Sequence, residues 1–280
     1  MRVLILGSRG MLGRQLVGAF DDLDTIGWDK EELDITDAKQ VQEKVSALRP
    51  HLIINAAAYT NVDGAETERE SAFAVNEVGV RNVAQAAKEV GAKMVHYSTD
   101  YVFSGEREEG YAEDDVPDAP VNAYGESKLA GERALAEIKP DYYLIRTAWL
   151  YGAGGKNFVD TILRLGREKP ELKVVDDQRG SPTYTVDLAD ATRMLVDAHE
   201  PGVYHAVNAG GVSWYEFARE IFQQAGLDTA VKPIPSAEYP LPAKRPRQSI
   251  LRNTRGPQLP EWQCALRDYL DSLQLDKKAI

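Results

Sequence analysis

The chain has 280 residues, of which 43% are hydrophobic and 28% are charged, and its formal net charge at pH 7 is −11. This composition is that of an ordinary globular protein, and the length allows one large domain or two closely packed lobes. The acidic balance argues against nucleic-acid binding and against adsorption to an anionic membrane. The sequence contains no run with the pattern of a secretory leader or a membrane span, and its single cysteine, Cys264, cannot form an internal disulfide, so we expect a cytoplasmic protein.

Short apolar runs alternate with helical patterns through the first half of the chain. The predicted strands are Val3–Leu6, Thr25–Trp28, Leu52–Asn55, Lys93–Tyr97 and Tyr143–Arg146. The predicted helices are Met11–Phe20, Ala38–Leu48, Ser71–Val90 and Ala123–Ile138. This alternation is typical of an α/β protein with a Rossmann-type, doubly wound parallel sheet, which binds its ligands at the carboxyl edge of the strands.

The second half of the chain is richer in glycine and proline, beginning after Trp149. A helix at Val186–Ala198 and a strand at Val203–Val207 predict that the chain returns once to the sheet. We therefore predict a dinucleotide-binding lobe in residues 1–149, joined by residues 184–208, and a smaller mixed C-terminal substrate lobe in residues 150–183 and 209–280. The stretch from 233 to 246 holds five prolines and cannot be regular helix or central strand.

One cationic segment stands out in this acidic chain. Residues 241–260 contain no acidic side chain and five basic ones, Lys244, Arg245, Arg247, Arg252 and Arg255. The segment suits a phosphate group of a ligand, or else it is a solvated basic loop.

A glycine-rich turn follows the first predicted strand. The first glycine, Gly7, permits the tight turn, the absent side chain of Gly10 admits a pyrophosphate, and Gly13 lets the helix pack closely on the strand. The free amides at the start of the helix face the phosphates. We expect a dinucleotide to contact this turn at Gly7, Ser8, Gly10, Met11, Leu12 and Gly13.

The identity of the nicotinamide cofactor depends on Asp29. It lies 22 positions after Gly7, close to the spacing at which a carboxylate accepts hydrogen bonds from the adenosine ribose. Such a carboxylate favours NADH over NADPH, although Lys30 next to it can pair with a 2′-phosphate and Asp29 can also be read as a turn residue. The other expected cofactor contacts are Asp34, Ile35, Ala57, Ala58, Tyr59 and Tyr97.

Tyr124 and Lys128 are the expected catalytic pair. A spacing of four residues places the phenol and the ammonium on the same face of a helix. We expect the ammonium to lower the pKa of the phenol, which then donates a proton to a ketone oxygen, and to hold the ribose of the nicotinamide. Thr99 follows the strand at the same sheet edge and is expected to hydrogen-bond the substrate carbonyl, with Ser98 as a strand-end cap.

The chain resembles the extended short-chain dehydrogenase/reductases and, among them, the dTDP-4-dehydrorhamnose reductase family. The stretches that carry the resemblance are residues 7–13, 55–63 (NAAAYTNVD), 96–103 (HYSTDYVF), 124–132 (YGESKLAGE), 146–152 (RTAWLYG), 177–183 (DQRGSPT) and 245–249 (RPRQS). The resemblance implies hydride transfer from NADH or NADPH to C4 of a 4-keto-6-deoxy sugar on thymidine diphosphate, with Tyr124 protonating the oxygen.

The resemblance also implies roles for the substrate contacts. Thr99 and Asp100 would touch the sugar, and Trp149 would pack on the sugar or its nucleotide. Contacts to the diphosphate or the base would come from Asn157, Arg179 and Arg245.

The same resemblance leaves assembly and reaction type open. Some family members dimerise through Mg²⁺ and an early glutamate, but this chain has Gln15 at that position, so we expect no metal and a monomer or homodimer. One alternative is a non-catalytic, dinucleotide-binding regulatory subunit, like a relative that serves methionine adenosyltransferase. The other is a nucleotide-sugar epimerase or dehydratase, because Asp100 follows Thr99 as an acid/base carboxylate would.

Overall fold

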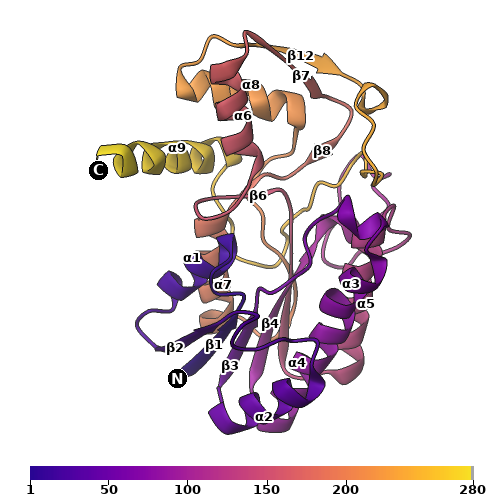
Figure 1. Ribbon diagram of the computed structural model, residues 1–280, viewed down its shortest axis with the longest axis vertical. Coiled ribbons are helices and arrows are strands. Elements are labelled where there is room, and N and C mark those ends of the chain that lie inside the picture. The colour runs from indigo at the N-terminus through magenta and orange to yellow at the C-terminus, as the bar shows by residue number, and fades with distance from the viewer. Residues whose placement is uncertain (279–280) are drawn as a thin grey trace.

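The computed structural model describes residues 1–278, and its central element is a six-stranded sheet in the order β10-β5-β4-β3-β1-β2 (Figure 1). Every neighbouring pair of these strands is parallel. The strand order reverses beside β1, which is the arrangement of a doubly wound sheet and confirms the predicted fold class. The strands are β1 (Arg2–Leu6), β2 (Asp24–Trp28), β3 (Leu52–Asn55), β4 (Lys93–Thr99), β5 (Tyr142–Thr147) and β10 (Gly202–His205).

Helices cover both faces of this sheet. One face packs against α1 (Met11–Ala19) and α7 (Thr185–Ala198), and the other against α2 (Ala38–Leu48), α4 (Val80–Val90) and α5 (Ala123–Ile138). Leu16 and Leu188 belong to the buried cluster on the first face. Val45 and Leu135 belong to the cluster on the second face. The strands are apolar on both sides because both sides are covered, which explains their continuous hydrophobic runs.

Three elements differ from their predicted bounds by two residues or more at one end. The strand expected at Val203–Val207 is β10 (Gly202–His205), which ends two residues earlier. The expected helix Ser71–Val90 is divided into α3 (Arg69–Phe73), a π-helical segment Ala74–Gly79 and α4. The π-helical segment is pressed against α5, since a Cβ atom on Gly131 would lie only 2.1 Å from the carbonyl oxygen of Asn76. Strand β4 continues two residues beyond Tyr97, because Ser98 and Thr99 pair with Arg146 and Thr147 of β5.

The C-terminal half adds a second group of elements above the sheet in Figure 1. Its helices are α6 (Phe158–Glu168), α8 (Trp214–Ala225) and α9 (Trp262–Lys278). Its strands form three pairs. These are β7 (Glu171–Val175) with β12 (Ala230–Ile234), β8 (Arg179–Gly180) with β11 (Val212–Ser213), and β6 (Leu150–Tyr151) with β9 (Thr183–Tyr184). Phe217 and Leu266 lie in its buried apolar cluster. Pro233 lies in β12, whose only partner in the described chain is β7, so the missing amide of proline is tolerated. The predicted boundaries between the two lobes stay a prediction.

None of the helices within residues 1–278 combines the length and the apolar character needed to cross a bilayer.

A buried ion pair ties α5 to β5. The guanidinium of Arg146 donates to both carboxylate oxygens of Glu132, at 3.0 and 2.8 Å, and the two side chains are 5% and 6% exposed. The same guanidinium lies over the ring of Phe103, 5.1 Å from its centroid. Each charge therefore depends on the other for solvation.

We expect Arg146→Met to lower the free energy of unfolding by about 3 kcal/mol, because it leaves Glu132 buried without a counter-ion. Urea denaturation followed by circular dichroism measures this change. Adding Glu132→Leu to the same chain should restore most of the stability, since no buried charge remains. A single variant as stable as the wild type would contradict this role of the ion pair.

Candidate active site

The glycine-rich turn between β1 and α1 has no room for side chains at Gly7 and Gly13. Gly7 adopts a φ of +77°, which other residues rarely adopt. A Cβ atom on Gly13 would lie 2.0 Å from the carbonyl oxygen of Gly7. The backbone of this turn is therefore bare, as close approach of a pyrophosphate requires.

A cavity of about 360 Å³ opens beside this turn, at the carboxyl ends of β1, β2 and β3. Eight residues predicted to contact the cofactor line it, namely Gly7, Gly10, Asp29, Asp34, Ile35, Ala57, Ala58 and Tyr59. Six further residues complete the lining without having been predicted as cofactor contacts, namely Leu6, Trp28, Lys30, Leu33, Ala56 and Val75. The size and the mixed lining of this cavity suit the adenosine part of a dinucleotide.

The remaining residues of the glycine-rich turn lie around the cavity or beneath it. The hydroxyl of Ser8 donates to Asp29 Oδ2 at 2.8 Å. Leu12 and Gly13 are buried under the turn. Met11 lies against the second half of the chain. A Cβ atom added to Gly155 would lie 3.0 Å from the Cβ atom of Met11.

Tyr124 and Lys128 lie at the start of α5, beside the end of β4. Asn122 caps this helix by accepting a hydrogen bond from the amide of Gly125 at 2.8 Å. The ammonium of Lys128 is buried and donates to the carbonyl oxygen of Tyr97 at 2.6 Å. The Tyr97 phenol points away and forms a 2.8 Å hydrogen bond with Thr192 of α7, so the part of Tyr97 that reaches Lys128 is its backbone.

Thr99 sits at the carboxyl end of β4. Its hydroxyl donates to Asp100 Oδ1 at 2.9 Å and accepts from the amide of Tyr101 at 3.2 Å. The same hydroxyl acts to lower the pKa of the Tyr124 phenol. The cap at the strand end is therefore made by Thr99, whereas the hydroxyl of Ser98 is buried and has no hydrogen-bond partner in residues 1–278.

The pKa shifts of Tyr124 and Lys128 differ from those expected from the sequence. Burial and the nearby Asp100 carboxylate raise the pKa of Tyr124 well above its usual range, so the expected lowering by Lys128 is wrong for this structure. The physical reason is that desolvation of the phenolate outweighs the other influences. Burial also lowers the pKa of Lys128 to about 8, with Glu132 opposing this change. Tyr124 therefore carries its proton at neutral pH.

Asp100 is a second ionisable group at this point. Burial raises the pKa of its carboxyl to about 7, although the nearby Ser249 hydroxyl and the hydrogen bond from Thr99 act in the opposite direction. Ser249 belongs to the cationic segment, and its hydroxyl also donates to the carbonyl oxygen of Arg179 at 3.3 Å. The C-terminal half thus reaches the strand end that carries Thr99.

Four of the predicted substrate contacts, Trp149, Asn157, Arg179 and Arg245, lie in the second half of the chain. Trp149 packs its indole against that of Trp214, with the two rings 5° from parallel. Arg179 pairs with Glu216 at 3.1 Å, and Arg245 pairs with Asp63 at 3.0 Å.

Asn157 has a clear role in the local fold. It caps α6 by accepting from the amide of Asp160 at 2.9 Å, and it donates to the carbonyl oxygen of Gly152 at 3.0 Å. Ligand contacts by Trp149, Asn157, Arg179 and Arg245 stay predictions.

Several residues at the site carried no recognisable signal in the sequence. Asn76 accepts from the amide of Tyr59 at 2.9 Å and donates to Ser127 Oγ at 3.0 Å, so it ties the turn after β3 to α5. Tyr101 packs edge-on against Tyr124, with ring centroids 6.0 Å apart. Arg9 projects from the glycine-rich turn toward Asp29.

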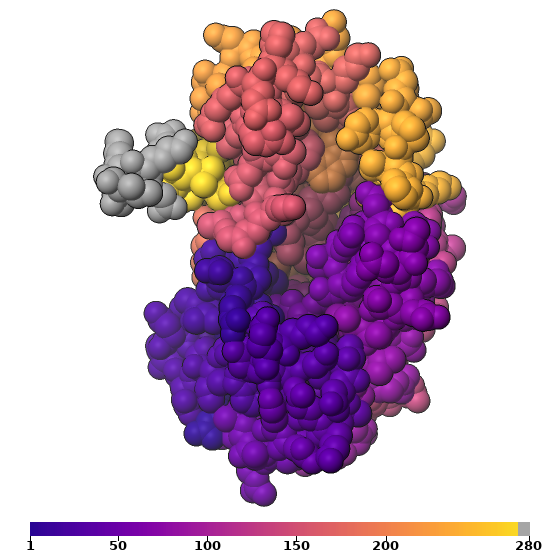
Figure 2. Space-filling model, in the orientation of Figure 1, coloured from indigo at the N-terminus to yellow at the C-terminus, as the bar shows by residue number. Residues whose placement is uncertain are grey.

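A depression marks the surface between the two halves of the chain. Figure 2 shows the surface hollowed where the indigo and purple atoms of the N-terminal half meet the salmon and orange atoms of the C-terminal half. The cationic segment crosses between the two halves, because Asn122 donates to the carbonyl oxygen of Lys244 at 2.8 Å and the amide of Ala243 donates to Asp63 at 3.1 Å.

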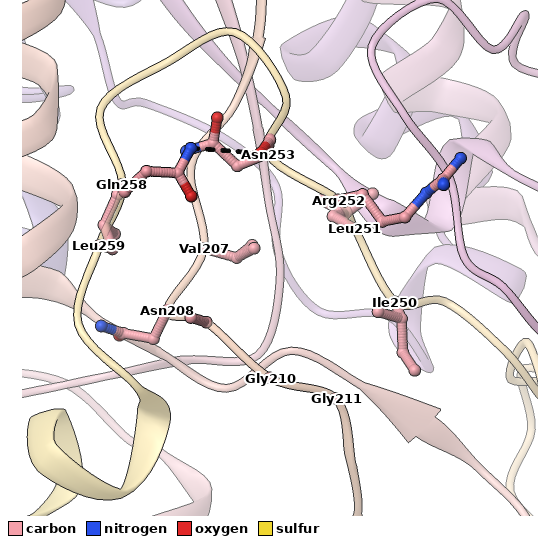
Figure 3. Close-up of a pocket in the computed structure, with 11 residues that line it drawn as sticks. Val207, Asn208, Gly210, Gly211, Ile250, Leu251, Arg252, Asn253, Gln258 and Leu259 are labelled. Carbon is pink, nitrogen blue, oxygen red and sulfur yellow. Dashed lines mark hydrogen bonds between the residues drawn. The ribbon is translucent and has the colours of Figure 1, made fainter.

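A second cavity of about 250 Å³ lies apart from these residues. It is lined by residues 207–211 and by residues 250–253 and 258–259, as Figure 3 shows. Within it, Gln258 donates to the carbonyl oxygen of Asn253 at 3.3 Å. None of the predicted site residues lines this cavity.

Known proteins are similar to this chain in sequence and in fold. A family model described as the RmlD substrate binding domain matches residues 1–275. The dTDP-4-dehydrorhamnose reductase of Streptomyces griseus is 43% identical over 288 residues, which cover 97% of this chain and 94% of that protein. The enzyme of the same name from Escherichia coli (strain K12) is 40% identical over 294 residues, covering 98% of each chain.

A solved structure agrees with the whole arrangement. The crystal structure of dTDP-4-dehydrorhamnose reductase from Bacillus anthracis str. Ames, in complex with NADP, has a TM-score of 0.93 and 45% identity, and the match covers 97% of this chain and 99% of that one. The resemblance found in the sequence motifs is thereby confirmed. The chain belongs to the RmlD substrate binding domain family, and the relatives from Streptomyces griseus and Escherichia coli that it resembles are named dTDP-4-dehydrorhamnose reductases.

Proposed function

We propose that this protein reduces the C4 ketone of dTDP-4-dehydro-L-rhamnose to dTDP-L-rhamnose with NADH or NADPH. The observation that carries the proposal is the meeting of Thr99, Tyr124 and Lys128 at the end of β4, on the sheet edge that also bears the glycine-rich turn. The names of the similar enzymes support this choice of substrate.

The chemistry divides between the cofactor and the chain. A nicotinamide dinucleotide, when bound, supplies the hydride for the carbonyl carbon. Tyr124 donates its phenolic proton to the oxygen, and it can do so because its raised pKa keeps it protonated until a more basic alkoxide develops. Thr99 orients the carbonyl through its hydroxyl, and Lys128 orients the ribose of the cofactor from a buried position.

The substrate nucleotide is held by the C-terminal half. Arg179 and Arg245 offer guanidinium groups that match the geometry of a diphosphate. Both now pair with carboxylates, Glu216 and Asp63, which they exchange for phosphate oxygens. Trp149 packs its indole on the sugar or its nucleotide.

Initial rates with a small panel of 4-keto nucleotide sugars test this function. We expect oxidation of NADH or NADPH, followed at 340 nm, with dTDP-4-dehydro-L-rhamnose and a rhamnosyl product by mass spectrometry. An inert protein that binds the dinucleotide would instead support the regulatory subunit.

The position of Asp100 also fits a second class of reaction, which the same assay can detect. Its carboxyl contacts Thr99 and ionises near neutrality, as the acid/base group of a dehydratase or epimerase does. Loss of water or inversion of a stereocentre without net consumption of dinucleotide would identify such an activity.

A further inference from the structure

Arg9 at the tip of the glycine-rich turn is surrounded by carboxylates. Its guanidinium lies 3.3 Å from Glu31 Oε2 and 3.6 Å from Asp29 Oδ2, and it also pairs with Glu32. Its side chain is 56% exposed, so these contacts form at the surface, at the rim of the cavity of about 360 Å³.

Asp29 joins this arrangement to the cavity. Its Oδ2 atom accepts hydrogen bonds from the Ser8 hydroxyl and the Arg9 amide, both at 2.8 Å. Its side chain is 21% exposed and lines the cavity. A ligand hydroxyl that reaches Asp29 therefore arrives within a few ångströms of the Arg9 guanidinium.

Carboxylates surround the cations of this rim. Four of them, on Asp29, Glu31, Glu32 and Asp34, lie close to Arg9 and Lys30. Two further cations contact the backbone here, since Lys44 donates to the carbonyl oxygen of Glu32 and Arg14 to that of Arg9. Lys30 is itself engaged, since its Nζ lies 3.8 Å from Asp34 Oδ2. Arg9 and Lys30 are thus both already paired with carboxylates.

We propose that Glu31 and Glu32 determine the choice of cofactor by engaging Arg9, so that the cavity binds a free adenosine ribose in preference to one bearing a 2′-phosphate. The proposal rests on the dinucleotide-binding role proposed for this cavity. A ribose hydroxyl donates to Asp29 without disturbing the ion pairs. A 2′-phosphate carries a charge of about −2 and must compete with both glutamates for the guanidinium.

Adenosine fragments test this without any catalytic step. Isothermal titration of 5′-AMP and of 2′,5′-ADP measures the effect of the 2′-phosphate alone. In Glu31→Gln/Glu32→Gln we expect 2′,5′-ADP to bind about tenfold more tightly, with 5′-AMP unchanged within about twofold. Glutamine at position 32 keeps an oxygen for the amide of Asp29, which now donates to Glu32 at 2.9 Å.

Two further variants isolate the cause. Glu137→Gln is the control. It removes an exposed carboxylate near the C-terminal end of α5, where Glu137 pairs with Arg81. This variant should change the affinity for neither 5′-AMP nor 2′,5′-ADP. Adding Arg9→Gln to the double variant should abolish the gain for 2′,5′-ADP. The gain should also shrink with added salt, because these side chains are exposed.

The outcomes separate this proposal from the proposed enzymatic function. Equal gains for both nucleotides, no gain, or a gain that survives the loss of Arg9 would each overturn the proposal. Binding of neither nucleotide would overturn the assignment of the cavity as well. Inactivity toward keto sugars together with the expected nucleotide affinities would contradict only the proposed reaction.

Discussion

Replacing Tyr124 with phenylalanine should lower turnover by about a hundredfold to ten-thousandfold while leaving dinucleotide affinity nearly unchanged. The substitution removes one oxygen atom, the proton donor, and keeps the ring that packs edge-on against Tyr101. Stopped-flow measurement of a single turnover reports the chemical step, and titration with NADH gives the dissociation constant.

A matched variant controls for the loss of any phenol. Tyr143 hydrogen-bonds to the carbonyl oxygen of His199 at 2.9 Å, near the amino end of β5 and far along the sheet from the site. Tyr143→Phe should therefore retain turnover. Undiminished turnover in Tyr124→Phe would mean that another group protonates the substrate oxygen.

Lys128→Met should lower turnover by about a hundredfold and weaken dinucleotide binding by about tenfold or more. The ammonium is buried, donates to the carbonyl oxygen of Tyr97 and stands one helical turn from Tyr124. Lys88→Met is the comparison, because Lys88 also donates to a backbone carbonyl oxygen, that of Ile138, but is exposed on α4. An unchanged dissociation constant in Lys128→Met would rule out its role in holding the ribose.

The pH dependence gives a second measure of Lys128. Burial lowers the pKa of this ammonium to about 8, so raising the pH through 8 removes its charge. The kcat/KM of the wild type should therefore fall above about pH 8. The same alkaline fall should be absent from the residual activity of Lys128→Met, which has no group to deprotonate.

The local motifs led to many of the residues around the cavity. Gly7, Gly10 and Asp29 were found from spacing alone, because a bare turn and a carboxylate at the next strand end are demands of the backbone path. Asn76 and Arg9 were not found in this way. Their roles depend on partners 17 and 20 positions away, which no local pattern connects.

The amino-acid sequence by itself determined the succession of strands and helices, the sheet edge that carries the glycine-rich turn, and the helix face shared by Tyr124 and Lys128. These follow from periodicity and from short-range backbone geometry. Only the tertiary structure decided the protonation of the pair, because the pKa of a phenol depends on how completely water is removed and on charges such as Asp100 that packing brings near. The ion pairs of Arg9 with Glu31 and Glu32 were decided in the same way, since turns from two different strands had to meet before opposite charges could compensate each other.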